Sequence, residues 1–237
     1  MPDSPSDDFP YDVVRRPRRR TVGITVKPDG SVIVAVPSRF PEWRIAELVR
    51  QKSGWIRKKR QQFLSVAADC QPKAFVCGET FELLGKKLVL QFVEDGAQPV
   101  RVDGDCLYAT LPGGLDARQH TGWLSERVLE WYRATALEHF RERVRQFVAP
   151  LGVAPATVGI KSYRSRWGSC HRDGRIYFNW RLVMAPAFVV DYVVIHELCH
   201  LLQHDHSPRF WRHVEAIYPS YREARCWLKV HGHRLDL

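Results

Sequence analysis

The feature that most constrains this chain is a largely apolar segment from Pro186 to Gln203 with three polar side chains near its centre. Its length and composition predict a helix buried inside a domain, and Pro186 suits the first turn because its missing N–H would have no intrahelical partner there. The polar residues are His196, Glu197 and His200. A buried polar group without a partner costs about 1 to 3 kcal/mol, so three of them together require a common explanation.

The spacing of the two histidines is typical of a metal site. Residues four apart lie nearly above one another on an α-helix, so His196 and His200 can direct imidazole nitrogens to one point about 2.0 to 2.1 Å from each, as Zn²⁺ requires. Glu197 lies beside that point. His196-Glu197-Leu198-Cys199-His200 is the HExxH pattern, in which the glutamate activates a metal-bound water. We therefore predict one zinc ion here, with Glu197 as the catalytic residue.

A catalytic zinc also needs a third protein ligand and an open position for water. We predict His206 as this ligand. Six residues of continuous helix would turn its side chain away from His200, so the chain must bend between them, and Ser207 with Pro208 provides an N-cap and first turn for a following helix. Cys199 is expected to be a small buried apolar residue. Other residues that could serve as third ligand are Asp205, His204, Glu215 and Glu223.

Two other interpretations compete with a catalytic metal site. In one, the histidines belong to a buried helix and have ordinary hydrogen-bond partners. In the other, the zinc is purely structural, but such sites usually close all four positions with Cys and His, whereas here a carboxylate stands beside the fourth position. The combination of HExxH with His206 favours the catalytic interpretation.

The rest of the chain predicts an α+β fold in three regions. Residues 1–20 are expected to be a disordered basic tail. Residues 21–118 are expected to form a small, mainly antiparallel β-rich region with a helix from Pro41 that could divide at Gly54. Residues 119–237 are expected to combine a long helical linker with the domain that carries the metal site.

Turn and periodicity signals refine this division. Asp29-Gly30 predicts a hairpin in the first β-rich region, and Asp173-Gly174 predicts another just before the buried helix. The apolar period of the long helix indicates that it ends before Pro150.

Charge and cysteine content suggest the partners and the compartment. The chain has 36 basic and 26 acidic residues, a formal charge of +10, which attracts DNA and other polyanions. The residues considered for such binding are Arg57, Lys58, Lys59 and Arg60; a solvated surface is the competing interpretation. Six cysteines without a CxxC pair and an N-terminus without an apolar leader predict a cytoplasmic protein, and no apolar run is long enough for a membrane helix.

The C-terminal third resembles a known family. The stretches YRSRWGSCHRDGRIYFNWRLVMAP and DYVVIHELCHLLQHDHSPRFW, with the sequence up to Gly232, resemble the YgjP-like (DUF45) metallopeptidase domain, which is related to SprT-like and Wss-type proteases. The resemblance is close over residues 155–232 and extends in layout to the rest of the chain. It implies a zincin-like domain with zinc held by His196, His200 and His206, and Glu197 as general base.

We therefore expect a zinc metallopeptidase that hydrolyses peptide bonds in a protein or peptide substrate, including proteins associated with nucleic acid. Alternatives are a zinc hydrolase of a non-peptide amide and a non-catalytic zinc-containing module that binds nucleic acid or protein.

The stretch from Arg164 to Cys170 is expected to be a strand edge that binds substrate. The residues expected to contact substrate are Arg164, Trp167, Gly168, Ser169 and Tyr192. A plain structural hairpin, with Trp167 in the core and a bulge at Gly168, is the competing interpretation. The oxyanion-stabilising residue is left open among Tyr192, Arg164, His204 and Tyr218.

Overall fold

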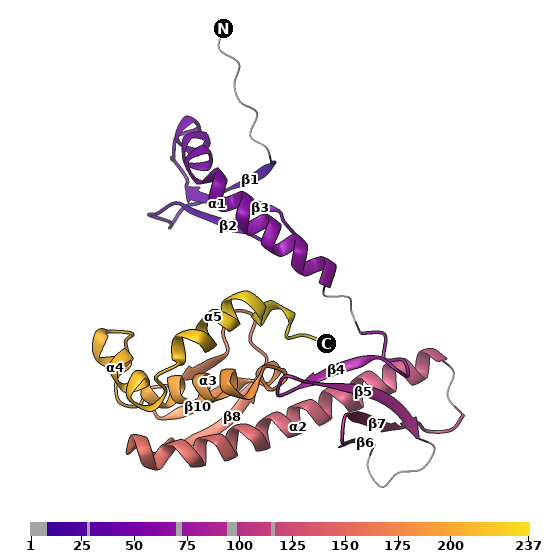
Figure 1. Ribbon diagram of the computed structural model, residues 1–237. Coiled ribbons are helices and arrows are strands. Elements are labelled where there is room, and N and C mark those ends of the chain that lie inside the picture. Colours follow the sequence, from indigo (N-terminus) through magenta and orange to yellow (C-terminus); the bar gives the residue numbers. More distant parts are fainter. Residues whose placement is uncertain (1–8, 28, 70–72, 94–98, 115–116) are drawn as a thin grey trace. The chain divides into compact units, whose positions relative to one another are not determined.

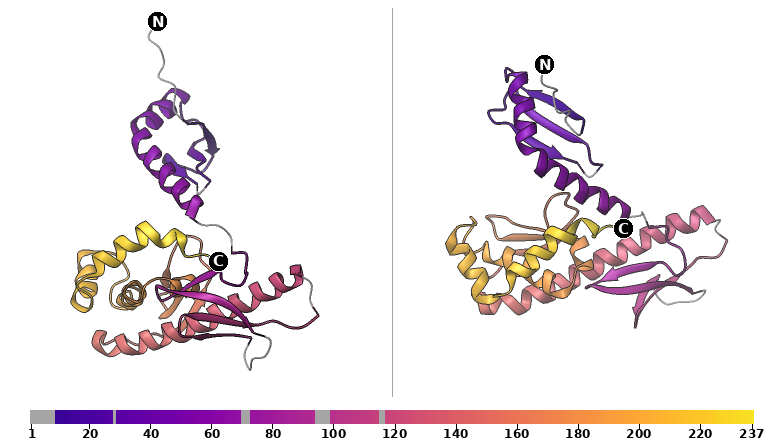
Figure 2. Two further views of the ribbon diagram at one scale, coloured as in Figure 1. Left: turned by 45° about the vertical axis from the view of Figure 1, so that its right-hand side comes forward. Right: turned by 45° about the horizontal axis from the view of Figure 1, so that its top comes forward.

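The computed structural model of this 237-residue chain describes residues 9–27, 29–69, 73–93, 99–114 and 117–237. The chain divides into two compact units, Met1–Gln71 and Pro72–Leu237 (Figures 1 and 2). Both units combine helices with small sheets, so the predicted α+β class is confirmed.

Unit 1 is a three-stranded sheet with one helix. Its strands are β1 (Tyr11–Arg16), β2 (Gly23–Val26) and β3 (Val32–Pro37), in the order β1-β3-β2. The β2–β3 pair is the predicted antiparallel hairpin. Helix α1 (Glu42–Asp69) runs through Gly54 without a break, and its buried residues pack on the alternating buried valines of β3. This core contains Ile45, Val49 and Ile56 from the helix and Val32, Val34 and Val36 from the strand.

The prediction of a disordered tail over residues 1–20 is wrong for the described part of that segment. Strand β1 pairs in parallel with β3, and Phe9 just before it is buried. Arg15 donates through Nη1 to the carbonyls of Ser38 (3.1 Å) and Phe40 (2.7 Å). The Asp, Pro and Ser content at the start of the chain, with few large apolar groups, suggested disorder. A parallel pair has no tight turn to mark it in the sequence, so the local pattern did not reveal β1. Residues 1–8 lie outside the described residues.

Unit 2 begins with a four-stranded sheet and a long helix. The strands are β4 (Thr80–Leu83), β5 (Lys86–Val93), β6 (Val100–Asp103) and β7 (Cys106–Thr110), in the order β4-β5-β7-β6. Helix α2 (Ala117–Leu151) includes Pro150 in its last turn, whereas the helix was predicted to end before this proline. The sheet and α2 share one core with the C-terminal helices.

The observed division of the chain therefore differs from the expected boundary at residue 118. Strands β4 to β7 were expected to belong with the N-terminal hairpin, but their buried side chains join the core of unit 2. Strand patterns show that one face is buried, and they do not show which core buries it.

The turn between β4 and β5 positions the buried helix. Leu84 and Gly85 both have positive φ, 51° and 77°. Their N–H groups donate to the carbonyls of Val183 (2.7 Å) and Met184 (3.2 Å), and a Cβ at residue 85 would lie 2.9 Å from Cα of Pro186. The sheet thus holds the short helix η1 (Trp180–Met184) and the start of α3 (Ala187–Cys199).

A second small sheet lies beside α3. It contains β8 (Thr157–Lys161), β9 (Gly168–Cys170) and β10 (Arg175–Asn179), in the order β8-β10-β9. The predicted hairpin is the antiparallel β9–β10 pair. The stretch before it does not form one strand: β8 pairs with β10 in parallel, and a loop over 162–167 leads to β9.

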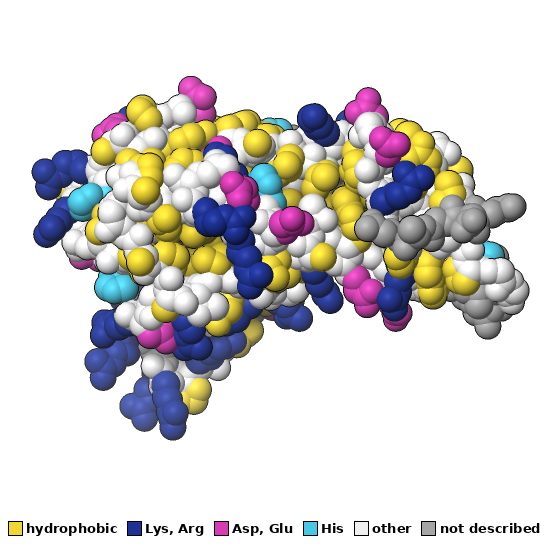
Figure 3. Space-filling view, turned by 90° about the horizontal axis from the view of Figure 1, so that it is seen from below, with side chains coloured by type: hydrophobic (Ala, Val, Ile, Leu, Met, Phe, Trp, Pro, Cys, Tyr) yellow, Lys and Arg dark blue, Asp and Glu magenta, His cyan; other side chains and the backbone are white. Residues whose placement is uncertain are grey.

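The remaining helices are α4 (Pro208–Ile217), α5 (Tyr221–His231) and the short η2 (Gly232–Arg234). Arg143 of α2 pairs with Asp191 of α3, with 2.5 Å between Nε and Oδ1, and joins the two helices. Figure 3 shows basic and acidic side chains intermixed with apolar ones on the face that it presents. In the part of the chain that the structure describes, no helix combines the length and the apolarity needed to cross a membrane.

Candidate active site

Helix α3 carries polar side chains into the interior of unit 2. Nine of its residues are buried, and most are aliphatic. Glu197 is 5% exposed and His200 is 9% exposed. Pro186 occupies the N-cap position of the helix, close to its predicted place in the first turn. The predicted buried helix with embedded polar groups is confirmed.

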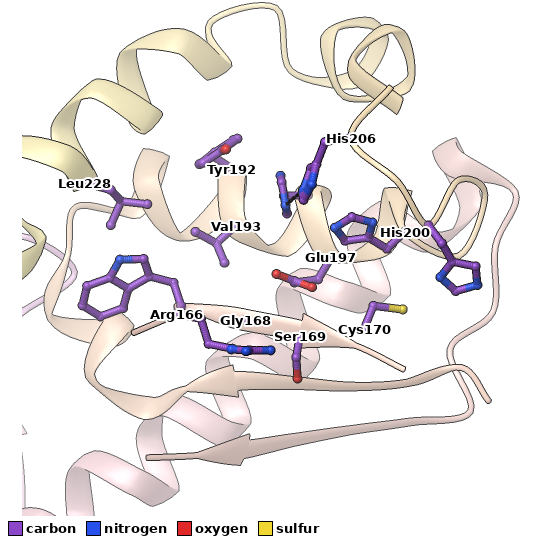
Figure 4. Close-up of a pocket in the computed structure, with 13 residues that line it drawn as sticks. Arg166, Gly168, Ser169, Cys170, Tyr192, Val193, Glu197, His200, His206 and Leu228 are labelled. Atoms are coloured by element: carbon purple, nitrogen blue, oxygen red, sulfur yellow. Dashed lines mark hydrogen bonds between the residues drawn. The ribbon is translucent and has the colours of Figure 1, made fainter. Parts of the chain in front are cut away.

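Three histidines converge at the end of this helix. The ring nitrogens that His196, His200 and His206 can offer all lie within 4.8 Å of one another, and Nε2 of His196 is 3.1 Å from Nε2 of His206. Two nitrogens bound tetrahedrally to one zinc at about 2.0 to 2.1 Å would be roughly 3.3 Å apart. The donor set and its spacing therefore fit a zinc ion. Figure 4 shows His200, His206 and Glu197 directed to the same region of the pocket.

Hydrogen bonding and burial keep these rings in the form that binds a metal. Nδ1 of His200 lies 3.1 Å from the carbonyl oxygen of Gln203; because a carbonyl can only accept, Nδ1 carries the proton and Nε2 has a free lone pair. Burial lowers the pKa of His196 to about 3, helped by His200 and His206 nearby. Burial also lowers the pKa of His200. Both imidazoles are therefore neutral at pH 7.

The bend that brings His206 to the other two rings is held by Asp205. Oδ1 of Asp205 accepts from the backbone N–H of Ser207 (3.1 Å) and from Nε2 of Gln203 (2.9 Å). The Ser207 side chain, then Gln203 and the Ser207 backbone, lower the pKa of the Asp205 carboxyl. Asp205, weighed as a third ligand, therefore shapes the turn. The sequence signal for this role is an Asp two residues before the N–H that it caps.

The remaining rivals for third ligand lie outside the histidine cluster. Glu215 pairs with Arg222 at 3.1 Å. His204 lines the pocket, but neither it nor Glu223 joins the group of convergent ligand atoms in the described chain. Cys199 is fully buried, in agreement with its expected packing role.

Aromatic residues of α4 fix the imidazole rings. Phe210 is fully buried, and its ring centroid lies 4.5 Å from that of His200 and 4.9 Å from those of His196 and His206. Trp211 stacks on His206 with a centroid distance of 5.9 Å. Because these rings limit imidazole rotation, the three nitrogens are held ready to meet.

Glu197 lies against the backbone of β9. A Cβ at Gly168 would be 2.5 Å from both Cγ and Oε1 of Glu197, so only glycine leaves room for the carboxylate in this place. Burial raises the pKa of Glu197 to about 8, and the charge of Arg166 opposes that rise. A cation bound by the histidines would also favour the ionised form.

The loop before β9 is held by residues at the end of β10. The buried Asn179 donates through Nδ2 to the carbonyls of Tyr163 (3.1 Å) and Arg166 (3.4 Å), and its N–H donates to the carbonyl of Trp167 (2.8 Å). The hydroxyls of Tyr163 and Ser169 are 2.6 Å apart. This network fixes the loop, and with it the position of Gly168.

A cavity of about 410 Å³ surrounds Glu197 and the histidines. Of the five residues expected to contact substrate, four line it: Trp167, Gly168, Ser169 and Tyr192. Arg164 is exposed and is not part of the lining. Arg166 lines the cavity in its place, and Leu228 of α5 completes the wall. The sequence contains both arginines two residues apart and gave no signal to choose between them.

Two candidates for oxyanion stabilisation, Tyr218 and Arg164, do not face the cavity as that role requires. Tyr218 donates its hydroxyl to the carbonyl of Phe188 at 3.0 Å, and Arg164 lies off the cavity. Tyr192 remains at the cavity wall, with its ring 5.7 Å from that of His196. Burial raises the pKa of its phenol to about 12, so Tyr192 is a hydrogen-bond donor at neutral pH.

The basic residues considered for nucleic acid lie on α1 of unit 1. Arg57 and Lys58 are exposed. Arg60 instead donates through Nε to the carbonyl of Gly30 at 2.9 Å, with its guanidinium 5.6 Å from the ring centroid of Phe9. Arg60 therefore supports the fold of unit 1.

Comparisons with known proteins give a family match and a similar solved structure. The family described as "YgjP-like, metallopeptidase domain" matches residues 20–231. A search of curated proteins finds no match. Among solved structures, the crystal structure of the metallopeptidase zymogen of Pyrococcus abyssi abylysin is similar, with 24% sequence identity and a TM-score of 0.35, over 39% of this chain and 95% of that one.

Proposed function

Because this chain belongs to the YgjP-like metallopeptidase family, we propose that it hydrolyses peptide bonds with one zinc ion held by His196, His200 and His206. The family makes the chain a metal-dependent peptidase. The observation that carries the finer proposal is the convergence of the three ring nitrogens within 4.8 Å beside a buried carboxylate. Histidine nitrogens with an adjacent glutamate suit zinc better than the hard cations that prefer oxygen ligands.

When bound, a zinc ion polarises the scissile carbonyl and acidifies water. Glu197 is the general base: its carboxylate takes a proton from the attacking water and passes that proton to the leaving amine. Gly168 and the apolar interior of α3 keep the carboxylate in one place. Tyr192 donates a hydrogen bond from the cavity wall to the developing oxyanion.

Strand β9 supports an extended substrate. It is the outer strand of its sheet. The N–H of His171 donates to the carbonyl of Arg175 at 2.8 Å, and hydrogen-bonded pairs alternate along an antiparallel ladder. Cys170 and Gly168 therefore direct their main-chain groups away from β10, to the free edge. A peptide that pairs with this edge would pass Glu197 in an extended conformation.

The test of this function is the zinc-loaded Glu197→Gln variant assayed on a casein digest. Replacing the carboxylate by an amide keeps the shape of the side chain and removes the base. We therefore expect the rate of peptide hydrolysis to fall at least roughly 100-fold, with zinc content unchanged. Full hydrolysis by this variant would exclude Glu197 as the base. Zinc-dependent cleavage of simple amides without cleavage of any peptide would instead favour the non-peptide hydrolase.

Fewer observations support recruitment to proteins associated with nucleic acid than support peptide hydrolysis. Between Arg50 and Arg60, helix α1 has basic residues and no acidic residue. Arg60, however, is hydrogen-bonded within unit 1. This recruitment stays a prediction.

A further inference from the structure

A slot on unit 1 lies next to an unpaired strand edge. Val22 and Ile24 from the β2 side, and Leu48, Lys52 and Trp55 from α1, line a cavity of about 360 Å³. In the sheet of the described chain, β2 is an outer strand with β3 as its neighbour. Helix α1 and strand β2 belong to the same unit (Figure 1), and residues of both line the slot beside the edge where a further strand would add.

The hairpin register shows which main-chain groups face that edge. The N–H of Lys27 donates to the carbonyl of Ser31 at 2.8 Å, and hydrogen-bonded pairs alternate along an antiparallel ladder. Thr25 is the next residue bonded to β3 in this register. Ile24 and Val26 consequently turn both N–H and C=O to the free edge, where the described residues supply no partner for them.

Apart from Lys52, the side chains that line the slot are apolar. Ile45, Val49 and Ile56 of α1 face the core of unit 1, whereas Trp55 lies on the flank and is 49% exposed. Ile24 is half-buried and contributes the strand side of the slot. A strand added beside β2 would point alternate side chains toward α1, so one aliphatic side chain would enter the slot.

The charge around the slot selects an acidic partner. Residues 9–69 contain fourteen Lys and Arg against five Asp and Glu. Lys52 lines the slot, and Arg19 lies near the start of β2, where its Nε donates to the carbonyl of Thr21 at 2.6 Å. Positive charge beside this short edge complements acidic side chains on an incoming strand.

The exposed main-chain groups also distinguish a peptide from a nucleic acid. Ile24 and Val26 offer donors and acceptors in alternation along the edge. An extended peptide offers both in return, whereas a phosphodiester backbone offers only acceptors and would leave the strand carbonyls unpaired. The slot walls of Val22, Ile24 and Leu48 are aliphatic and suit a branched aliphatic side chain.

We propose that unit 1 binds an extended acidic polypeptide segment, which adds to β2 as a strand and inserts one aliphatic side chain between Ile24 and Trp55. The site is separate from the zinc ligands and Glu197, and binding there requires no hydrolysis. It gives the chain a means to hold a protein partner apart from catalysis.

The probe is a fluorescein-labelled peptide of alternating valine and glutamate, titrated with the full-length protein and followed by fluorescence anisotropy. Mass spectrometry confirms that the probe stays intact. We expect saturable binding, and Trp55→Ala should raise Kd roughly tenfold. Trp43→Ala is the matched control: Trp43 is an indole on the same helix, 65% exposed and outside the slot lining, and its loss should change Kd by less than about twofold. Circular dichroism checks that both variants are folded.

Two altered peptides test the mode of binding. Methylation of the amide nitrogens keeps the side chains and removes every donor, so binding should be lost if the peptide adds as a strand. Replacement of glutamate by lysine should also abolish binding. Equal affinity for the methylated peptide, or equal affinity in Trp55→Ala, would overturn the proposal. One further outcome would also overturn the proposal: the protein binds labelled oligothymidine but not the peptide, and Trp55→Ala abolishes that binding. The slot would then be a base-stacking site.

Discussion

Gly168 and Glu197 are in such close contact that a Cβ on the glycine would lie 2.5 Å from Oε1 of the carboxylate. The two residues come from different elements, β9 and α3, and the loop before β9 is fixed by Asn179. The position of Glu197, the proposed general base, is therefore set by the sheet as well as by the helix that carries it.

Gly168→Ala should impair catalysis without removing the metal. The added methyl must displace the Glu197 carboxylate, and a displacement of about 1 Å in a catalytic group can lower the rate roughly 100-fold. The histidine ligands are untouched, so zinc content should remain that of the wild type. The measurement is kcat on a peptide substrate, with zinc quantified in the same sample.

Gly122→Ala is the control for that substitution. A Cβ at Gly122 of α2 meets nothing within 4 Å, and alanine favours a helix over glycine, so activity should be unchanged. If Gly168→Ala is as active as Gly122→Ala, the contact with Glu197 has no catalytic consequence.

Stability should fall in mild acid because buried histidines resist protonation. His139 of α2 is half-buried, and burial, then the charge of Arg143, lowers its pKa. The folded state thus binds fewer protons than the unfolded state below about pH 6.5, so the free energy of unfolding decreases as pH falls through that range. His196 and His200 act in the same direction in metal-free protein.

His139→Gln tests this account by urea unfolding of the metal-free protein at pH 7.5 and 5.5. Glutamine does not titrate, so the variant should lose less stability between the two pH values than the wild type. An identical loss in both proteins would mean that His139 does not contribute.

The motif residues were predictable because a helix imposes its own geometry. The placement of His196 and His200 one turn apart follows from the helical period, and the need for a bend before His206 follows from the same period. The role of Asp205 was missed because it depends on hydrogen bonds within the bend. The sequence predicted that His206 lies with the other two histidines, as it does, without showing what holds it there.

Features that depend on contacts distant in sequence were harder to predict. Strand β1 pairs in parallel with β3, and β8 pairs in parallel with β10, and neither pairing has a turn signal. The arginine that faces the cavity is Arg166 rather than Arg164 because the segment is a loop, in which the alternation of a strand does not apply. The expected boundary at residue 118 failed for a related reason: the core that a strand joins is decided by packing.

Binding to DNA through α1 should be weak and controlled by salt. Each phosphate contact changes the slope of log K against log salt by about 0.9, so neutralising Arg57, Lys58 and Lys59 together should flatten that slope. Arg60 is left in place because it bonds to Gly30. Retention on a DNA column that is the same for wild type and the triple variant would remove the recruitment hypothesis.

The most direct test of the proposed metal centre is the zinc content of purified His206→Ala, measured by inductively coupled plasma mass spectrometry beside His204→Ala. Both histidines line the cavity, but only His206 belongs to the convergent set. We predict one zinc per chain in the wild type and in His204→Ala, and loss of zinc and of peptidase activity in a folded His206→Ala. A His206→Ala protein that keeps one zinc per chain and cleaves peptides normally would contradict the account.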